Sequence, residues 1–188
     1  MSGTNRILCV CSHNRTRSVI MAALLRRRLA ARVDEAGGAM PVIANVGLGP
    51  PGMPITPGVA EVLASHGVDA QKIAMHTSRQ LTDRIALEAH LILTAERAHV
   101  LSISTRSRQL FERTFTLPEF VARASVVGPR GDDSLEAWLR RINDGRDASQ
   151  YMHADVPIIL DPTGLPSPAL EHCTTEVDVL CARFAELW

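Results

Sequence analysis

Residues 6–28 of this chain, R-I-L-C-V-C-S-H-N-R-T-R-S-V-I-M-A-A-L-L-R-R-R, decide its fold. The run from Ile7 to Cys11 is apolar without polar alternation, which is typical of a strand buried on both faces of a parallel sheet. After Ser18 the apolar residues recur four positions apart, and this period predicts an amphipathic helix. The loop from Ser12 to Arg17 therefore joins the end of a strand to the start of a helix.

A loop in this place is suited to bind phosphate. A helix N-terminus has unpaired backbone N–H groups and a partial positive charge. Successive loop amides can surround three phosphoryl oxygens, while the planar guanidinium of Arg17 pairs with two of them. The same field favours an ionised thiol, so we expect Cys11 to act as a nucleophilic thiolate. The alternative is a buried strand cysteine before an ordinary surface loop, since the spacing of Cys11 and Arg17 alone is a weak signal.

Asp161 is the candidate for the acid that a leaving alkoxide or phenolate requires. It lies in V-P-I-I-L-D-P-T-G-L-P, residues 156–166, between an apolar run and the last predicted helix. Loops punctuated by proline and glycine often carry functional groups. Asp-Pro is also a common way to begin a turn, and spacing does not distinguish the two interpretations.

The remaining chain alternates between predicted strands and helices. Strands are expected at 6–11, 41–46, 90–94 and 113–116, and helices at 18–32, 57–65, 96–105, 118–124, 134–143 and 167–188. This order predicts an α/β fold with a doubly wound sheet of about four parallel strands, helices on both faces and the ligand at the carboxyl ends of the strands. We expect one domain, residues 1–188, with an irregular insertion around 127–155 that is either a mobile cover or an elaborated surface loop.

The composition argues against several other classes. Lysine plus arginine and aspartate plus glutamate are balanced at 20 each, so no nucleic-acid partner is expected. No apolar run approaches the roughly 18 residues of a membrane span, and no signal peptide is expected. Four unpatterned cysteines fit a reducing, cytoplasmic location. The seven histidines lack metal-ligand spacing, and we expect neither a metal nor another cofactor.

Five segments, around Cys11, 47–67, 76–80, 91–96 and Asp161, resemble the low-molecular-weight protein tyrosine phosphatase family in the same order along most of residues 6–188. That family has a C-x-G-N-x-C-R-S loop, a glycine turn after the second strand, a His-x-x-Arg segment and a late Asp-Pro. This chain keeps Cys11, Asn14, Arg17, Ser18, Gly47, His76, Arg79, Asp161 and Pro162. The resemblance implies a phosphatase I-like fold and a metal-independent phosphomonoester hydrolase that forms a cysteinyl phosphate.

The resemblance also implies roles for individual residues. Cys11 would be the nucleophile, Arg17 the phosphate clamp, and Asp161 the acid that later activates water. The rest of the phosphate-binding loop would be Ser12, His13, Asn14, Arg15, Thr16 and Ser18, with Ser18 bonding the thiolate and Asn14, Asn45 and His76 supporting the loop. The substrate would be a phosphorylated protein or a small phosphomonoester, and the activity would follow a bell-shaped pH profile on the acidic side.

Three departures from the family pattern affect specificity. Thr16 replaces the second loop cysteine, so a protective disulfide with Cys11 is lost. Residues 48–51 and 163–164 contain none of the aromatic side chains that relatives use to line the substrate slot, which weakens the expectation of tyrosine specificity. Arg15 replaces an apolar residue, and it either recruits acidic groups beside a phosphosite or is simply a solvated charge.

Two other functions remain open at this point. His13 replaces the family glycine and resembles the arsenate reductase branch of the same fold, which would need an external thiol here because Cys9, Cys173 and Cys181 fit core positions. The third interpretation is a catalytically weak phosphate-binding module. Residues 158–160 separate the dipeptide Val156-Pro157 from the dipeptide Asp161-Pro162, and this spacer could hold Asp161 away from the phosphate-binding loop. Phosphotyrosine, phosphoarginine and metabolite phosphates all remain possible substrates.

Overall fold

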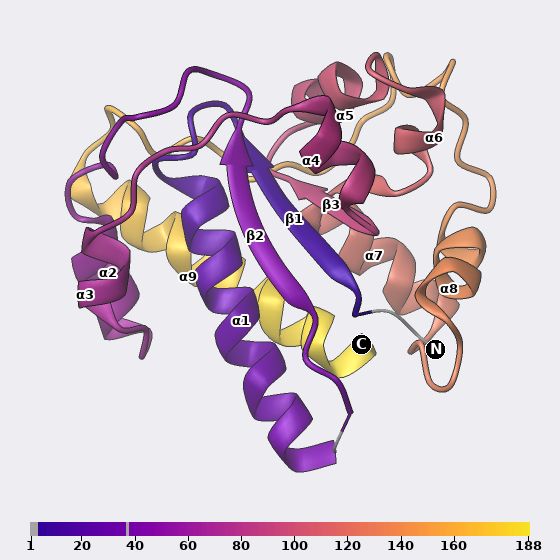
Figure 1. Ribbon diagram of the computed structural model, residues 1–188, viewed down its shortest axis with the longest axis horizontal. Helices are drawn as coiled ribbons and strands as arrows, with labels where there is room; N and C mark the ends of the chain where they lie inside the picture. Colours follow the sequence, from indigo (N-terminus) through magenta and orange to yellow (C-terminus); the bar gives the residue numbers. More distant parts are fainter. Residues whose placement is uncertain (1–3, 37) are drawn as a thin grey trace.

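The computed structural model describes residues 4–36 and 38–188. Its centre is a sheet of four parallel strands in the order β2-β1-β3-β4 (Figure 1). The strands are β1 (Arg6–Cys11), β2 (Val42–Gly47), β3 (Leu91–Thr94) and β4 (Thr114–Thr116). The predicted α/β fold with about four parallel strands is confirmed, and each predicted strand agrees within one residue at either end.

Helices surround this sheet: α1 (Arg17–Ala36), α2 (Val59–Ser65), α3 (Ala70–Ala74), α4 (Asp83–Glu88), α5 (Arg97–Ser104), α6 (Arg108–Phe111), α7 (Leu117–Val127), α8 (Leu135–Ile142) and α9 (Ser167–Leu187). The six predicted helices are all present, with shifted ends. The helices α3, α4 and α6 were not predicted, because one turn or little more is too short to display a 3.6-residue period.

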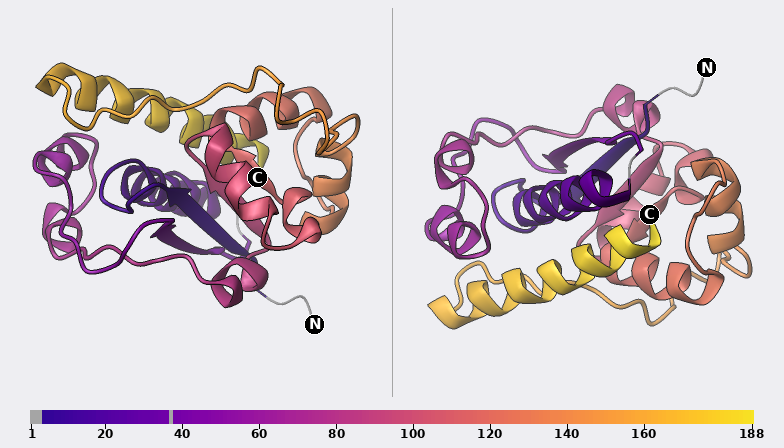
Figure 2. Two further views of the ribbon diagram at one scale, coloured as in Figure 1. Left: turned by 90° about the horizontal axis from the view of Figure 1, so that it is seen from above. Right: turned by 90° about the horizontal axis from the view of Figure 1, so that it is seen from below.

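Both faces of the sheet are covered, as predicted. Alternate side chains of β1 point into two different apolar layers. Ile7 and Cys9 belong to the layer that contains residues of α1, α7, α8 and α9, whereas Leu8 and Val10 belong to a layer with residues of α4, α5 and α6. The views along the sheet show α9 running beside α1 on one face (Figure 2). This two-sided burial explains why β1 is apolar from Ile7 to Cys11.

The strand order places a binding crevice next to β1. From β1 the chain continues to β2 on one side, and β3 lies on the other, so the loops that leave their carboxyl ends diverge there. The segment before Asp161 is fastened to the same edge: Ile159 N donates to Ala95 O over 2.8 Å, and Thr116 Oγ1 donates to Pro157 O over 2.7 Å. These bonds hold residues 156–166, which we call the late loop, above the end of β1.

The region 127–155 is irregular on either side of α8, and Arg146 anchors it. The Arg146 Nε donates to Glu119 Oε1 over 2.7 Å, and its guanidinium lies 4.2 Å from the Phe111 ring centroid and 4.0 Å from that of Phe115. Tyr151 Oη donates to Glu119 Oε2 over 2.7 Å. The insertion is therefore bound to α7 by a buried ion pair.

Within residues 4–36 and 38–188, no helix is long and apolar enough to span a bilayer.

Candidate active site

The loop after β1 turns its carbonyl groups away from the cleft. Cys11 O and Ser12 O accept from Leu48 N (3.1 Å) and Gly49 N (2.7 Å), and Arg15 O accepts from Thr56 N (3.0 Å). No acceptor in the described part of the chain pairs with the backbone N–H groups of residues 12–16. Because its carbonyls are bonded outward and these amides are free, the loop can offer a ring of donors to an anion.

Asn14 holds the shape of this loop. Its backbone is left-handed, with φ of 55°, which short polar residues tolerate better than other non-glycine residues. Its Nδ2 donates to Asn45 Oδ1 (2.7 Å) and to Ser18 Oγ (3.0 Å), while its Oδ1 accepts from Arg79 N (2.9 Å). Its carbonyl oxygen lies 2.8 Å from His76 Nε2. Asn45 and His76 thus lie behind the loop, in contact with Asn14.

Gly47, the last residue of β2, makes room for the loop. A Cβ atom at this position would lie 2.7 Å from both Asn14 N and His13 C, and 3.0 Å from Ser12 O. These neighbours are backbone atoms and cannot rotate away. The match to the family glycine therefore has a steric cause, and Gly47 permits the close packing of β2 against the phosphate-binding loop.

The Cys11 side chain is 3% exposed and contacts a hydroxyl. Its Sγ lies 3.1 Å from Ser18 Oγ. Since Ser18 Oγ already accepts from Asn14 Nδ2, the Ser18 proton is available to donate to an ionised Sγ. The chain of donors from Asn14 through Ser18 therefore leads to the candidate nucleophile.

Arg17 is the first residue of α1 and is only 2% exposed, and its guanidinium donates to two carboxylates and a backbone carbonyl. Its Nη1 donates to Glu96 Oε1 and to Ile159 O (3.1 Å), and its Nη2 donates to Asp161 Oδ2 (2.7 Å). A buried guanidinium between two carboxylates has a fixed plane. Arg17 is thereby held at the base of the cleft, facing the late loop.

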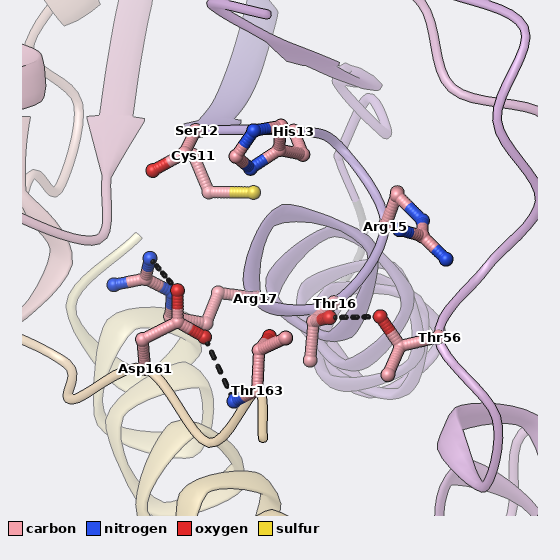
Figure 3. A pocket seen from close by; sticks show the side chains of 9 residues that line it. All are labelled: Cys11, Ser12, His13, Arg15, Thr16, Arg17, Thr56, Asp161 and Thr163. Carbon is pink, nitrogen blue, oxygen red and sulfur yellow. Dashed lines mark hydrogen bonds and ion pairs between the residues drawn. The ribbon is translucent and has the colours of Figure 1, made fainter.

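Asp161 lies across the cleft from Cys11 (Figure 3). Its side chain is 44% exposed, and its Oδ1 accepts from Thr163 N over 3.0 Å. Partial burial raises the pKa of Asp161, but the Thr163 hydrogen bonds and the charges of Arg17 and His13 outweigh it, so the pKa lies below its usual range. The spacer 158–160 thus does not hold Asp161 away from the loop.

Nine residues line the cleft, and none is phenylalanine, tyrosine or tryptophan: Cys11, Ser12, His13, Arg15, Thr16, Arg17, Thr56, Asp161 and Thr163. Thr16, which replaces the second loop cysteine of the family, contacts the segment after β2: its Oγ1 lies 2.6 Å from Thr56 Oγ1 (Figure 3). This hydrogen bond closes one wall of the cleft. The structure brings every predicted site residue together. Asn14, Ser18, Asn45 and His76 lie behind the cleft, and the others line it.

Glu96, His99 and Thr56 belong to the same site, although their roles were not predicted from the sequence. Glu96 pairs with Arg17, and its backbone N–H donates to His99 Nδ1 over 3.2 Å. The other ring nitrogen, Nε2, must then carry the proton that it shares with Ser12 Oγ at 3.0 Å. Burial lowers the pKa of His99 to about 4, so this donor is neutral. The sequence did place Glu96 just beyond β3. Because the loops that follow parallel strands meet at the carboxyl edge of the sheet, this position could have identified Glu96 as a site residue.

The other cysteines lie in the core. Burial raises the pKa of both Cys9 and Cys173 to about 12 and that of Cys181 well above its usual value. All four cysteines of the chain are free thiols in the structure. A buried, protonated thiol is a poor partner for disulfide exchange, so an internal relay of thiols from Cys11 lacks a reactive second member.

Comparisons with known proteins identify the family of the chain. The family model for low molecular weight phosphotyrosine protein phosphatases matches residues 6–144. The probable low molecular weight protein-tyrosine-phosphatase EpsP of Ralstonia nicotianae is 34% identical over 144 residues, covering 76% of this chain and 91% of that protein.

Solved structures show the same fold. The low molecular weight protein tyrosine phosphatase from T. tengcongensis has a TM-score of 0.68 at 21% identity, covering 97% of this chain and 99% of that chain. The YwlE arginine phosphatase from Geobacillus stearothermophilus has a TM-score of 0.67 at 24% identity, covering 97% and 91%. At these identities the likeness establishes the fold alone.

A strand-end cysteine beneath a loop of free amides, with a buried arginine and a facing aspartate, defines a cysteine-dependent enzyme class that acts on phosphate groups. Within that class, the chain belongs to the low molecular weight phosphotyrosine protein phosphatase family. The family assignment does not favour the arsenate reductase alternative.

Proposed function

We propose that this protein is a phosphatase of the protein-tyrosine-phosphatase type, which hydrolyses phosphomonoesters through a cysteinyl-phosphate intermediate. The observation that carries the proposal is the cleft itself, where Cys11, Arg17 and Asp161 converge from β1, α1 and the late loop. The free amides of residues 12–16 support the same conclusion, because they are suited to hold the phosphoryl oxygens.

In the first step the Cys11 thiolate attacks phosphorus in line with the ester oxygen. The S–P bond forms as the P–O bond to the leaving group breaks, and Asp161 transfers its proton to the departing oxygen. Arg17 and the loop amides compensate for the negative charge on the phosphoryl oxygens. The products of this step are the free alcohol or phenol and cysteinyl phosphate, with Asp161 ionised.

In the second step the Asp161 carboxylate accepts a proton from water as that water attacks phosphorus. The S–P bond breaks, inorganic phosphate leaves, and Cys11 returns as a thiolate. Asp161 is then protonated again and ready for the next substrate. Water and the ester are the only reactants consumed, and the cycle needs no redox partner.

The first step requires Cys11 as a thiolate and Asp161 as a protonated acid, whereas at neutral pH a free cysteine is mostly protonated and a free aspartate is ionised. Asp161 has a lowered pKa while Arg17 and Thr163 hold its carboxylate. A bound phosphate dianion beside it opposes ionisation and raises that pKa, so the substrate itself promotes the acid form. This coupling predicts an acidic optimum for the reaction.

We propose a phosphorylated protein or a small phosphomonoester as substrate, in a reducing compartment such as the cytosol, because a thiolate nucleophile must stay unoxidised. The named relatives are tyrosine phosphatases, and one solved neighbour is an arginine phosphatase. The cleft has no phenylalanine, tyrosine or tryptophan wall to stack on a phenyl ring, so binding would depend chiefly on the phosphoryl group.

The test is p-nitrophenyl phosphate hydrolysis by wild type, Cys11→Ser and Asp161→Asn. Turnover should vanish in Cys11→Ser, and it should fall in Asp161→Asn with loss of the alkaline limb of the kcat profile, because that limb reports the acid. Arg84→Gln, an exposed change on α4 that loses only the bond to Glu88, is the control for folding.

Two further results would contradict the proposal. Thiol-dependent arsenate consumption without ester hydrolysis would favour the reductase. Phosphate binding without turnover by the wild type would favour the binding module.

A further inference from the structure

Arg15 occupies the mouth of the cleft with most of its hydrogen-bonding capacity unused. Its Nε donates to Pro54 O over 2.7 Å, and its carbonyl accepts from Thr56 N. These two bonds attach the Arg15 side chain and backbone to the segment 54–56. In the described ranges 4–36 and 38–188, no carboxylate lies within 4.0 Å of its guanidinium, and its Nη atoms have no protein acceptor.

The position of this guanidinium relates directly to the leaving group. Arg15 lines the same cleft as Cys11 and Asp161, and it lies on the side away from Asp161 (Figure 3). Arg17 occupies the base of the cleft, where the phosphoryl group would bind. The Arg17 side chain is buried, whereas Arg15 is only partly buried, so Arg15 lies nearer to solvent, where the rest of the substrate would emerge. The other mouth residues, His13, Thr56 and Thr163, add no negative charge.

From this geometry, and resting on the proposed phosphatase activity, we infer that Arg15 forms an anion subsite for the leaving group. The substrate is a phosphomonoester that carries a second anionic group, a carboxylate or phosphate, beside the esterified oxygen. A guanidinium that is already oriented by Pro54 loses little side-chain freedom when it pairs with such an anion. A cationic leaving group, such as the guanidinium of phosphoarginine, meets like charge at the same point.

The charge of the leaving group can be varied without altering the reacting bond. Suitable probes are 4-(carboxymethyl)phenyl, 4-methylphenyl and 4-(aminomethyl)phenyl phosphate, in which a methylene insulates the phenol oxygen from the charge. For wild type we expect kcat/KM for the anionic ester to exceed that for the cationic ester by about three- to tenfold at low salt. Raising the ionic strength should reduce this ratio, because the interaction is partly exposed.

Variants of Arg15 separate charge from loop structure. Arg15→Gln should bring the anionic-to-cationic ratio close to one, whereas Arg15→Lys should retain a ratio above one. The ratio is taken within each enzyme, so a general loss of activity from the broken Pro54 bond cancels. Arg84→Gln removes a remote exposed arginine and should leave the wild-type ratio unchanged. An equal ratio in wild type and Arg15→Gln would overturn the inference.

A second panel distinguishes the two sources of such an anion. Phosphoglycolate represents small acids, and a phosphotyrosine peptide with glutamate neighbours is compared with the same peptide carrying glutamine. Preference for the acidic peptide identifies a protein substrate, and preference for phosphoglycolate identifies a small diacid. A failure of the wild type to hydrolyse any ester would reject the phosphatase itself, whereas hydrolysis without charge preference rejects only the Arg15 subsite.

Discussion

At the scale of single residues, Asn14 fixes the shape of the phosphate-binding loop through both its backbone conformation and its side-chain hydrogen bonds. Its left-handed backbone bends the loop, and its buried amide joins Ser18, Asn45 and the backbone of Arg79. A glycine could adopt the same φ but could make none of these bonds, and an alanine would adopt it only under strain and could make none of them either. The residue is therefore required for both its conformation and its hydrogen bonds.

We expect Asn14→Ala to lower the free energy of unfolding by about 4 kcal/mol, from three lost hydrogen bonds at about 1 kcal/mol each and about 1 kcal/mol of added strain at φ of 55°. Asn14→Gly should recover about 1 kcal/mol of that loss because the strain is absent. Urea unfolding at neutral pH measures both. Equal stabilities for the two variants would show that the left-handed backbone costs nothing here.

His99 makes the stability of the protein depend on pH. Burial lowers its pKa to about 4 from 6.5, so the unfolded chain takes up the proton first as the pH falls. The stabilisation is complete above about pH 6.5 and is lost progressively down to about pH 4.

Between pH 7 and 5, wild type should lose about 1–2 kcal/mol more unfolding free energy than His99→Asn, which cannot titrate. Urea unfolding at the two pH values gives the difference. Carboxyl groups ordinarily titrate below pH 5, so they contribute little to the change in unfolding free energy between pH 7 and 5. Identical pH dependence in both proteins would contradict this account of the buried imidazole.

At the scale of secondary-structure elements, the site depends on how closely β2 lies against the loop after β1. Gly47→Ala places a Cβ 2.7 Å from backbone atoms of the loop, so the loop must move. We expect turnover to fall at least about tenfold with a stability loss of about 1–3 kcal/mol.

Gly131→Ala is the matched control for Gly47→Ala. Gly131 has φ of +56°, and a Cβ atom added to it would meet no atom within 4 Å outside its two chain neighbours. Only backbone strain of about 1–2 kcal/mol is therefore expected, with turnover unchanged. Steady-state hydrolysis and urea unfolding of both variants separate the two effects. Wild-type turnover in Gly47→Ala would show that the loop has room to spare.

The insertion around α8 is attached to the rest of the molecule by the Arg146–Glu119 pair, in which the Arg146 side chain is 2% exposed. Arg146→Ala leaves the buried Glu119 carboxylate with only the more distant Arg123, 3.8 Å away, as a cation, and we expect a loss of about 3–5 kcal/mol. Arg140→Ala, which removes an exposed pair with Glu136, should cost less than about 0.5 kcal/mol. Thermal and urea unfolding test both, and similar small losses would mean that the insertion is not anchored by this pair.

At the scale of the whole molecule, one apolar layer extends from β1 and α1 to α7, α8 and α9. Arg28 reinforces it with two bonds of 2.7 Å to Asp178, which join α1 to α9. Because the layer is continuous, we propose that residues 1–188 form one domain.

The single-domain proposal predicts one cooperative unfolding transition. Fluorescence of Trp138 and Trp188, whose ring centroids lie 6.3 Å apart, reports the α7–α9 side, and chemical labelling of Cys9 reports the sheet. The midpoints of the two probes in urea should coincide. An earlier transition by fluorescence alone would show that the C-terminal part unfolds separately.

Much of this architecture could be predicted because its signals are local. The apolar run of β1 and the helical period after Ser18 place the strand, the loop and α1 without reference to any other segment. The short helices α3, α4 and α6 and the role of Glu96 could not be predicted in this way. Glu96 is a helix-preceding acid in the sequence, and only the approach of α5 to Arg17 gives it a buried partner.

The sequence by itself determined the α/β order and the elements of the phosphate-binding loop, since these depend on residues close together in the chain. Only the tertiary structure decided that Asp161 reaches the cleft, because its position depends on hydrogen bonds from Ile159 and Thr116 to segments far away in the sequence. It also decided which arginine lies at the base and which at the mouth. That distinction follows from the carboxylates that surround Arg17 and from Pro54, which orients Arg15.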